Sequence, residues 1–338
     1  MAIQYRPWRE GDDLELLQLW GDPESRVGEQ FRGAFAPSSG TGDGDAAGAA
    51  GTGESWRQCI VAEDVVDGVS IPVAAGVVYE TPLHGERLWS YIEVSRDHRG
   101  QGIGSSLLVM LRREAELSPS GVTRLRSKVA AGSAGEAFTA SAGLQPIQRS
   151  RLVEVSAGSL KLPVFDGDGE DAGSDVVMDL ATGSVELTQL VGKYYRSVHS
   201  WDDPGELSVG TVQRLFLDDA SGAHGAIVLR AKPESAFGST VTPTRKGRIR
   251  AFAVSYAAPL LGEGAPEVAS EVFLGHDPEL DADDAAEAVR DLLALIAYQH
   301  PVVLEVDDSM TAVRAAVEPL LASGGARQIG QDIRVISE

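Results

Sequence analysis

Six consecutive residues of this sequence combine one arginine with alternating glycines: Arg99, Gly100, Gln101, Gly102, Ile103 and Gly104. The stretch before them, RLWSYIEVS, alternates as a strand does, and the stretch after them has helical spacing as far as Leu117. A turn that opens a helix presents unpaired backbone N–H groups at the positive end of the helix dipole, where anions bind. Glycines let a phosphate approach the backbone, and an arginine adds a charge-assisted contact. These residues therefore predict a phosphate-binding loop.

Two common phosphate-binding loops do not fit this spacing. A nucleotide-binding P-loop requires GxxxxGK followed by Ser or Thr, and no lysine follows these glycines. A dinucleotide-binding loop requires GxGxxG, a parallel sheet that starts at the loop and an acidic residue at the end of the next strand. Here the spacing is GxGxG, antiparallel strands are expected before the loop, and the next strand ends in SKVA. The spacing therefore argues against ATP and NAD as the ligand.

The run VSRDHRGQGIGSSLL, residues 94–108, resembles the acetyl-CoA loop of the GCN5-related N-acetyltransferase (GNAT) superfamily. Arg99, Gly102 and Gly104 stand at the three positions of its [Q/R]xxGx[G/A] signature, and Val94 stands where the family has a valine. The segment YRPWREGDDLELLQLW resembles the family's first strand and helix, and AFTASAGLQPIQRS resembles its closing helix and strand. The resemblance extends from residue 3 to about residue 155, the size of a single domain.

This resemblance implies acetyl-CoA as co-substrate, with its pyrophosphate on the loop and its pantetheine arm along the preceding strand. The residues that it implies for cofactor binding are Ile92, Glu93, Val94, Arg99, Gly100, Gln101, Gly102, Ile103, Gly104, Ser105 and Ser133. The implied reaction is direct attack of a primary amine on the acetyl thioester. Proximity and a proton acceptor for the ammonium group would provide the catalysis.

The general base is not fixed by the sequence. The family's usual base is a glutamate an even number of residues before the valine, because alternate residues of a strand share a face. Glu86 satisfies this parity, whereas Glu93 requires a bulge that shifts the register. Both glutamates stay candidate catalytic residues, beside a water-relayed base or none, and each could equally be an ordinary solvated carboxylate.

Two further positions depart from the family pattern. The tyrosine that the family carries four residues before a Gly-Phe pair corresponds here to Thr139, four residues before Gly143-Leu144. A threonine hydroxyl is far too weak an acid to replace it. The asparagine that often starts the same helix falls on Gly132 or Ser133. These departures leave the acid role without a candidate.

Composition excludes several other classes. The formal net charge of -21 and the pI of about 4.6 argue against nucleic-acid binding, which requires clustered Lys and Arg. A single cysteine, Cys59, excludes an intramolecular disulfide, and six scattered histidines give no metal-binding spacing, so no metal is expected. No apolar run of about 18 residues is present, and the start of the sequence has no signal-peptide pattern. We expect a soluble cytoplasmic protein with no membrane partner.

The order of predicted elements repeats along the chain. Residues 1–156 read βααβββαβαβ, residues 157–175 form a Gly/Asp-rich linker, and a second series of strands and helices follows over 176–338. The two series are offset by about 180 residues. We predict an α/β (α+β) fold of two tandem GNAT-like domains, each a mixed, mostly antiparallel sheet flanked by helices. Residues 36–55, rich in Gly, Ala, Ser and Asp, are expected to be a flexible insertion in the first domain.

The second series lacks a comparable loop. The corresponding run, HDPELDADDAA, places Glu279, Asp281, Asp283 and Asp284 at the start of a helix. Carboxylates there satisfy the free N–H groups themselves and repel phosphate. We therefore predict a degenerate second domain that binds no CoA.

The function predicted from the sequence is acetyl-CoA-dependent N-acetyl transfer to a primary amine. The alternative is a non-catalytic CoA-binding sensor or scaffold, in which the missing tyrosine reflects lost chemistry. The acidic balance favours a cationic acceptor, either a small molecule or a protein amine. The sequence leaves the acceptor open, as well as the choice between a monomer and a homodimer.

Overall fold

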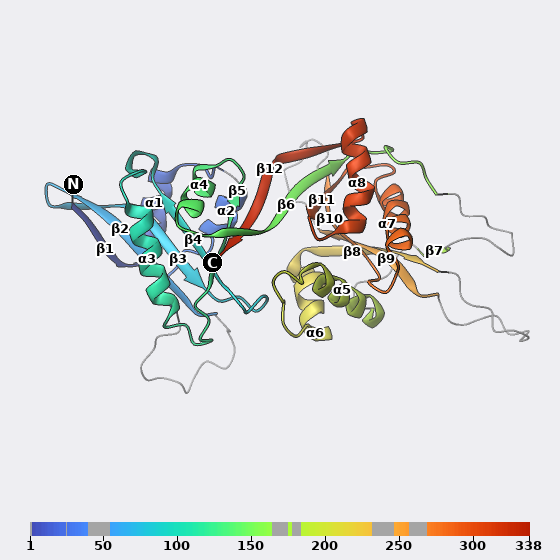
Figure 1. The fold of residues 1–338 in the computed structure, drawn as a ribbon, viewed down its shortest axis with the longest axis horizontal. Coiled ribbons are helices and arrows are strands. Elements are labelled where there is room, and N and C mark those ends of the chain that lie inside the picture. Colours follow the sequence, from blue (N-terminus) through green and yellow to red (C-terminus); the bar gives the residue numbers. More distant parts are fainter. Residues whose placement is uncertain are drawn as a thin grey trace, which may run out of the picture. The chain divides into compact units, whose positions relative to one another are not determined.

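The computed structural model describes residues 2–24, 26–39, 55–163, 175–177, 184–231, 247–256 and 269–338 (Figure 1). These residues form a mixed α/β fold in which helices flank mixed β-sheet, as the sequence predicts. Residues 40–54 of the expected insertion and residues 164–174 of the expected linker lie outside the described residues.

Contacts divide the chain into two compact units. The first unit contains Met1–Arg149, Asp202–Gly205 and Ile333–Glu338, and the second contains Ser150–Trp201 and Glu206–Asp332. The two units therefore exchange their last strands: the end of the first half of the chain belongs to the second unit, and the end of the chain belongs to the first. The domain boundaries expected from the sequence, after residues 156 and 175, did not include this exchange and stay a prediction.

The first unit follows the predicted order of elements. Its helices and strands are β1 (Ala2–Pro7), α1 (Asp12–Trp20), α2 (Arg26–Arg32), β2 (Arg57–Val66), β3 (Val69–Tyr79), β4 (Leu88–Val94), the 3₁₀ turn η1 (Arg96–His98), α3 (Ile103–Ala115), β5 (Leu125–Ala130), α4 (Ala134–Ser141) and the start of β6 (Gln145–Val155). Strands β1 to β4 pair antiparallel in sequence order, β4 and β5 run parallel, and the last residues of β12 (Ala326–Ser337) pair antiparallel with β5.

Helices α1 and α3 cover opposite faces of this sheet, because alternate residues of a strand point to opposite sides. On one face Leu16 of α1 packs with Cys59 and Val77. On the other face Leu107 of α3 packs with Ala62 and Ala74. The small residues of β3 let α3 approach closely: a Cβ at Gly76 would lie 3.1 Å from the side chain of Leu111.

The second unit repeats this arrangement with a larger core. Its elements are the end of β6, β7 (Asp175–Val177), α5 (Val185–Val198), α6 (Val209–Val212), the turns η2 (Gln213–Leu217) and η3 (Asp219–Ser221), β8 (Ala223–Arg230), β9 (Ile249–Tyr256), β10 (Ser270–His276), α7 (Ala282–Ile296), β11 (Val302–Asp307), α8 (Thr311–Ser323) and the start of β12. Strands β7 to β10 pair antiparallel, β10 and β11 run parallel, and β11 pairs antiparallel with β6.

Two expected elements differ in the second unit. The spacing of VGTVQRLFLDD predicts a helix over residues 209–219, but the structure has a single turn, α6, followed by a π-helical turn, within which the Gln213 side-chain amide donates to the Leu217 carbonyl at 3.4 Å. The last strand begins at Ala326, whereas the alternation of DIRVIS predicts a start at residue 332. The earlier residues are mostly exposed and polar, so no alternation marks them as a strand.

Deleting Ile333–Glu338 tests the strand exchange. The deletion removes the partner of β5 and two buried side chains, Val335 and Ile336, each worth roughly 1.5–3 kcal/mol of burial. We expect the first unit to unfold at a lower temperature while the second keeps its stability. Hydrogen exchange of the truncated chain measures this, with the full-length chain as control. Equal protection of β5 in both proteins would contradict the exchange.

Candidate functional site

The glycine loop lies between β4 and α3, as predicted. Gly100 and Gly102 have φ angles of 75° and 83°, in the left-handed region that side chains with a Cβ rarely adopt. Gly102 is the N-cap of α3, and no side chain among the described residues caps this helix. Because the first N–H groups of a helix have no partner within it, those of α3 stay available to an anion.

The loop is braced from within and by one acidic residue. Gln101 donates from its amide to the Asp97 carbonyl at 3.1 Å, and Arg99 donates from Nε to the Val94 carbonyl at 3.0 Å. Arg99 also lies 3.3 Å from Glu24, which Arg96 contacts at 2.9 Å. These arginines, Arg96 first, hold the pKa of Glu24 below its ordinary value. Arg99 therefore turns back toward β4, and a phosphate would compete with Glu24 for it.

Strands β4 and β5 part soon after they begin. Their register pairs Leu88 with Leu125 and Trp89 with Arg126, and the Ser90 hydroxyl then donates to the Arg126 carbonyl at 3.1 Å. Beyond this point each strand keeps only its outer neighbour, β3 for β4 and β12 for β5. The inner edge of β4 at the predicted pantetheine-binding residues 92–94 is therefore unpaired with β5, while their outer edge pairs with β3.

The other predicted cofactor-binding residues differ in burial and in the contacts they make. Ile103 is buried in the core, and Ser105 is exposed on the first turn of α3. Gly104 lies close to α4, since a Cβ there would meet the Phe138 ring at 3.5 Å. Ser133 is the N-cap of α4 and accepts from the Glu136 N–H at 3.2 Å, so its oxygen already has a structural role.

The candidate base Glu93 lies in a polar cluster on the α2 side of β4. Arg32 donates to both of its carboxylate oxygens, at 2.6 and 2.9 Å, and the Tyr91 hydroxyl donates at 3.0 Å. The hydrogen bond that Arg32 donates to Glu93 raises the pKa of Arg32, and burial raises the pKa of Tyr91. Arg32 is thus a fixed cation and Tyr91 a fixed donor, and together they hold Glu93 in place.

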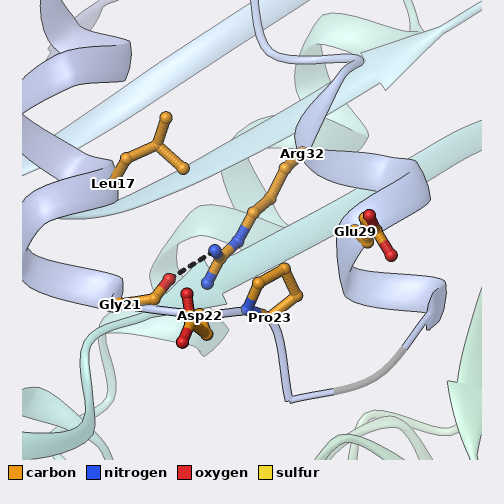
Figure 2. A pocket seen from close by; sticks show the side chains of 6 residues that line it. All are labelled: Leu17, Gly21, Asp22, Pro23, Glu29 and Arg32. Carbon is orange, nitrogen blue, oxygen red and sulfur yellow. Dashed lines mark hydrogen bonds between the residues drawn. The ribbon is translucent and has the colours of Figure 1, made fainter. Parts of the chain in front are cut away.

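An open pocket lies beside this cluster. It has a volume of about 420 Å³, and its walls are Leu17, Gly21, Asp22, Pro23, Glu29 and Arg32 (Figure 2). Arg32 donates from Nη1 to the Gly21 carbonyl at 2.6 Å, which ties the segment after α1 to α2. The same guanidinium therefore contacts both the pocket and Glu93.

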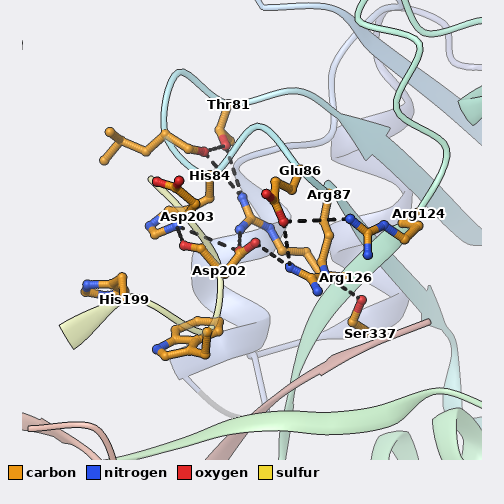
Figure 3. A network of polar contacts seen from close by, with 12 residues as sticks. Thr81, His84, Glu86, Arg87, Arg124, Arg126, His199, Asp202, Asp203 and Ser337 are labelled. Carbon is orange, nitrogen blue, oxygen red and sulfur yellow. Dashed lines mark hydrogen bonds and ion pairs between the residues drawn. The ribbon is translucent and has the colours of Figure 1, made fainter. Parts of the chain in front are cut away.

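The second candidate base, Glu86, lies before β4 and is about half exposed, 3.7 Å from Arg124. At roughly 3.3 Å per residue along a strand, it lies some 20 Å from Ile92. Close to it, Arg87 and Arg126 converge on Asp202, which the first unit takes from the second half of the chain (Figure 3). Arg126 also stacks over Trp89 at 4.1 Å, so this buried network fixes the end where β4 and β5 are paired.

The comparisons with known proteins fit this geometry. A solved structure described as a GCN5-related N-acetyltransferase, from Sphaerobacter thermophilus, aligns over 99% of this chain and 95% of its own, with a TM-score of 0.56 and 12% identity. This chain has the GCN5-related N-acetyltransferase fold. A second such structure, from Anabaena variabilis, aligns over 99% of this chain and 72% of its own, with a TM-score of 0.48 and 8% identity. No family model matches the sequence, and no curated protein does.

No described helix has the length and apolar character needed to cross a bilayer. No group of three or more His, Cys, Asp or Glu side chains in the described part of the chain is arranged to hold a metal ion.

In the second unit, a side chain caps the corresponding helix, α7. The side chain of Asp281 caps α7 by accepting from the Asp284 N–H at 2.9 Å. Glu279 and Asp277 pair with Arg248 instead, at 2.6 and 2.5 Å. One N–H group at the start of α7 is therefore bonded by a side chain, and that side chain is Asp281 rather than all four predicted carboxylates.

Aromatic rings pack against the end of β10. Strands β10 and β11 part after three paired residues. The rings of Tyr194 and Phe252 lie directly against Gly275, the last residue but one of β10. A Cβ at Gly275 would lie 2.6 Å from the Tyr194 ring. In the first unit the residue at the same place in β4 is Glu93, which α2 reaches with Arg32. Helix α2 thus places a cation against β4, and α5 places an aromatic ring against β10.

Some residues of the site carry no sequence signal. Arg32 lies in a segment that shows only weak helical spacing, and its partner Glu93 is distant in the chain. Asp202 follows a helix of the other half, so only the fold brings it to Arg126. The residues around Arg32 and Asp202 show no local pattern that predicts these contacts.

Replacing Gly102 by Asp tests the loop. A side chain at φ 83° strains the turn, and a carboxylate at the start of α3 repels phosphate. We expect no CoA binding by calorimetry. Gly68→Asp is a matched control, because Gly68 has a φ of 82° in the β2–β3 turn and open space around it. If both variants bind CoA equally, the loop is not the phosphate site.

Proposed function

We propose that this chain is an acetyl-CoA-dependent N-acetyltransferase whose first unit binds the cofactor. One observation carries the proposal: β4 and β5 pair over only two residues and then part toward an uncapped helix start at Gly102. An extended chain fits the unpaired β4 edge and a pyrophosphate fits the loop, which are the two parts of CoA nearest the thioester. The fold comparison supports the same reaction class.

The second unit, in this proposal, is a degenerate copy of the first. Its order of strands and helices is the same, its helix start is capped by Asp281, and Tyr194 packs against Gly275 of β10. The buried Tyr194 hydroxyl has no hydrogen-bond partner among the described residues, so the ring is held there by packing alone. One CoA per chain is the expected stoichiometry.

The proposed reaction is aminolysis. The lone pair of a neutral amine attacks the thioester carbonyl carbon, the C–S bond breaks, and the proton released from the amine nitrogen ends on the CoA thiolate. The protein supplies proximity and a route for that proton. Tyr91 on β4 is a poor acid because burial raises its pKa, so in this proposal water passes the proton of the amine on to the thiolate.

Glu93 is the carboxylate best placed for the proton-accepting role. It lies on β4 next to the proposed pantetheine edge, and Arg32 connects it to the pocket of Figure 2. Because Arg32 occupies both carboxylate oxygens, an incoming ammonium group would have to share them. The acceptor would therefore enter over the α1–α2 segment, where Asp22 and Glu29 favour a cationic amine.

Free-thiol release tests the proposed function directly. The protein is incubated with acetyl-CoA and a panel of amines, and CoA thiol is followed with a thiol reagent. Background from the protein is low because burial raises the pKa of its only cysteine, Cys59, to about 11. Turnover with any amine of the panel supports the transferase.

A non-catalytic CoA-binding module is the second candidate. The Arg32–Glu93 ion pair and the absence of an acid at Thr139 favour it, since Thr139 donates to the Glu136 carbonyl within α4. Binding of CoA without turnover over a broad amine panel would favour this module. A thermal-shift assay with no effect of CoA would exclude both candidates.

Exchanging Glu93 for Gln tests the base. Gln keeps an oxygen for Arg32 but accepts no proton, so we expect kcat to fall by about 100-fold while KM for acetyl-CoA stays nearly unchanged. Glu86→Gln is the control and should leave kcat within about twofold. If Glu93→Gln retains full activity, a water relay carries the proton and Glu93 has only a structural role.

A further inference from the structure

A serine, a histidine and an aspartate form a chain of contacts beneath the glycine loop. The Ser95 Oγ lies 2.7 Å from His98 Nδ1, and His98 Nε2 lies 3.5 Å from Asp64 Oδ2. Ser95 directly follows β4, His98 ends the 3₁₀ turn η1, and Asp64 belongs to β2. These contacts thus connect the segment between β4 and the glycine loop with β2, which is separated from β4 by β3. We refer to these three side chains as the Asp64–His98–Ser95 relay.

Asp64 is an unusual residue for its position. It is 3% exposed, and its Oδ1 has no hydrogen-bond partner among the described residues. Its neighbour Glu63 points to the opposite face and pairs with Arg6. A buried carboxylate without a partner is costly, and the imidazole of His98 is the group that faces Asp64. The burial of Asp64 on β2, opposite His98, therefore requires an explanation.

One histidine tautomer satisfies both contacts. With the proton on Nε2, His98 points an N–H at Asp64, and its Nδ1 accepts from the Ser95 hydroxyl. Ser95 is in turn fixed by its backbone, whose N–H donates to the Val73 carbonyl at 3.0 Å, and its carbonyl accepts from the His98 N–H at 3.0 Å. The turn η1 is therefore held at both ends.

The arrangement resembles a nucleophilic Ser–His–Asp set in residue types, but it is not built for that chemistry. Ser95 is 3% exposed, so its hydroxyl is closed to a substrate. A nucleophile of this kind also requires oxyanion donors beside an accessible serine. The relay is suited to holding a position.

We propose that Asp64, His98 and Ser95 are positioning residues that fix the loop in the conformation that receives the CoA pyrophosphate. The other side-chain contacts of residues 96–102 described above are the pairs of Arg96 and Arg99 with the half-exposed Glu24 and two bonds to carbonyls of the same segment, from Arg99 to Val94 and from Gln101 to Asp97. By tying His98 to β2, the relay fixes the start of the segment that ends at Gly102. The loop is then ordered before CoA arrives, which lowers the entropy cost of binding. This inference rests on the proposed function.

Calorimetric CoA titration of four variants tests the relay: Asp64→Ala, His98→Ala, the double variant and Asp64→Asn. Each alanine variant should raise the Kd for CoA by about tenfold, and the double variant should be no more than about twofold weaker than either, because both remove one linkage. Asp64→Asn keeps an oxygen for the His98 N–H and should bind nearly as the wild type does. Asp97→Asn, on the exposed side of the same turn, is the charge-matched control and should leave Kd within about twofold.

Each result decides between distinct outcomes. Wild-type binding with an unchanged Kd in His98→Ala overturns the relay and leaves the proposed function intact. Effects of the two single variants that multiply in the double variant also overturn it, since independent residues behave in that way. No CoA binding by the wild type overturns the proposed function and the relay together. Unfolding curves without CoA accompany each titration, and if Asp64→Ala does not fold, His98→Ala and Asp64→Asn decide.

Discussion

Backbone hydrogen bonding is the constraint on which this structure depends. Strands β4 and β5 are each fully paired on their outer sides, but to one another they are bonded only at Leu88 and Trp89. Past Trp89 the inner edges cannot satisfy each other, and unsatisfied backbone groups in a protein interior are costly. In the proposed function, a bound extended chain would pair with this inner edge of β4 in the first unit. The buried Arg126–Asp202 pair and the Arg126–Trp89 stack hold the paired end, so the parting begins at a defined residue.

The second unit has the same parting of strands with different side chains beside it. Its strands β10 and β11 also part, but the glycine at Gly275 admits the rings of Tyr194 and Phe252, and Asp281 caps the helix that follows. Under the proposed function, this contrast distinguishes a binding unit from a structural unit.

The sequence predicts the fold and the loop better than it predicts the side-chain chemistry. Strand alternation, helical spacing and the glycines at 100 and 102 are local signals, and the structure confirms the order of elements in the first unit and the place of the glycine loop between a strand and a helix. Arg32 on Glu93 and Asp202 on Arg126 join residues far apart in the chain, and nothing local marks them. The exchange of β6 and β12 between the units is invisible for the same reason, since any strand with alternating residues can pair with either partner.

Hydrogen exchange with and without CoA measures the central claim most directly, because it reports on backbone N–H groups without knowledge of the acceptor amine. If CoA lies along β4 and on the loop, exchange should slow at residues 92–94 and 99–106, while residues 277–285 of the second unit stay unchanged. Slowing at residues 277–285, or no slowing at the glycine loop when CoA is saturating, would contradict this account.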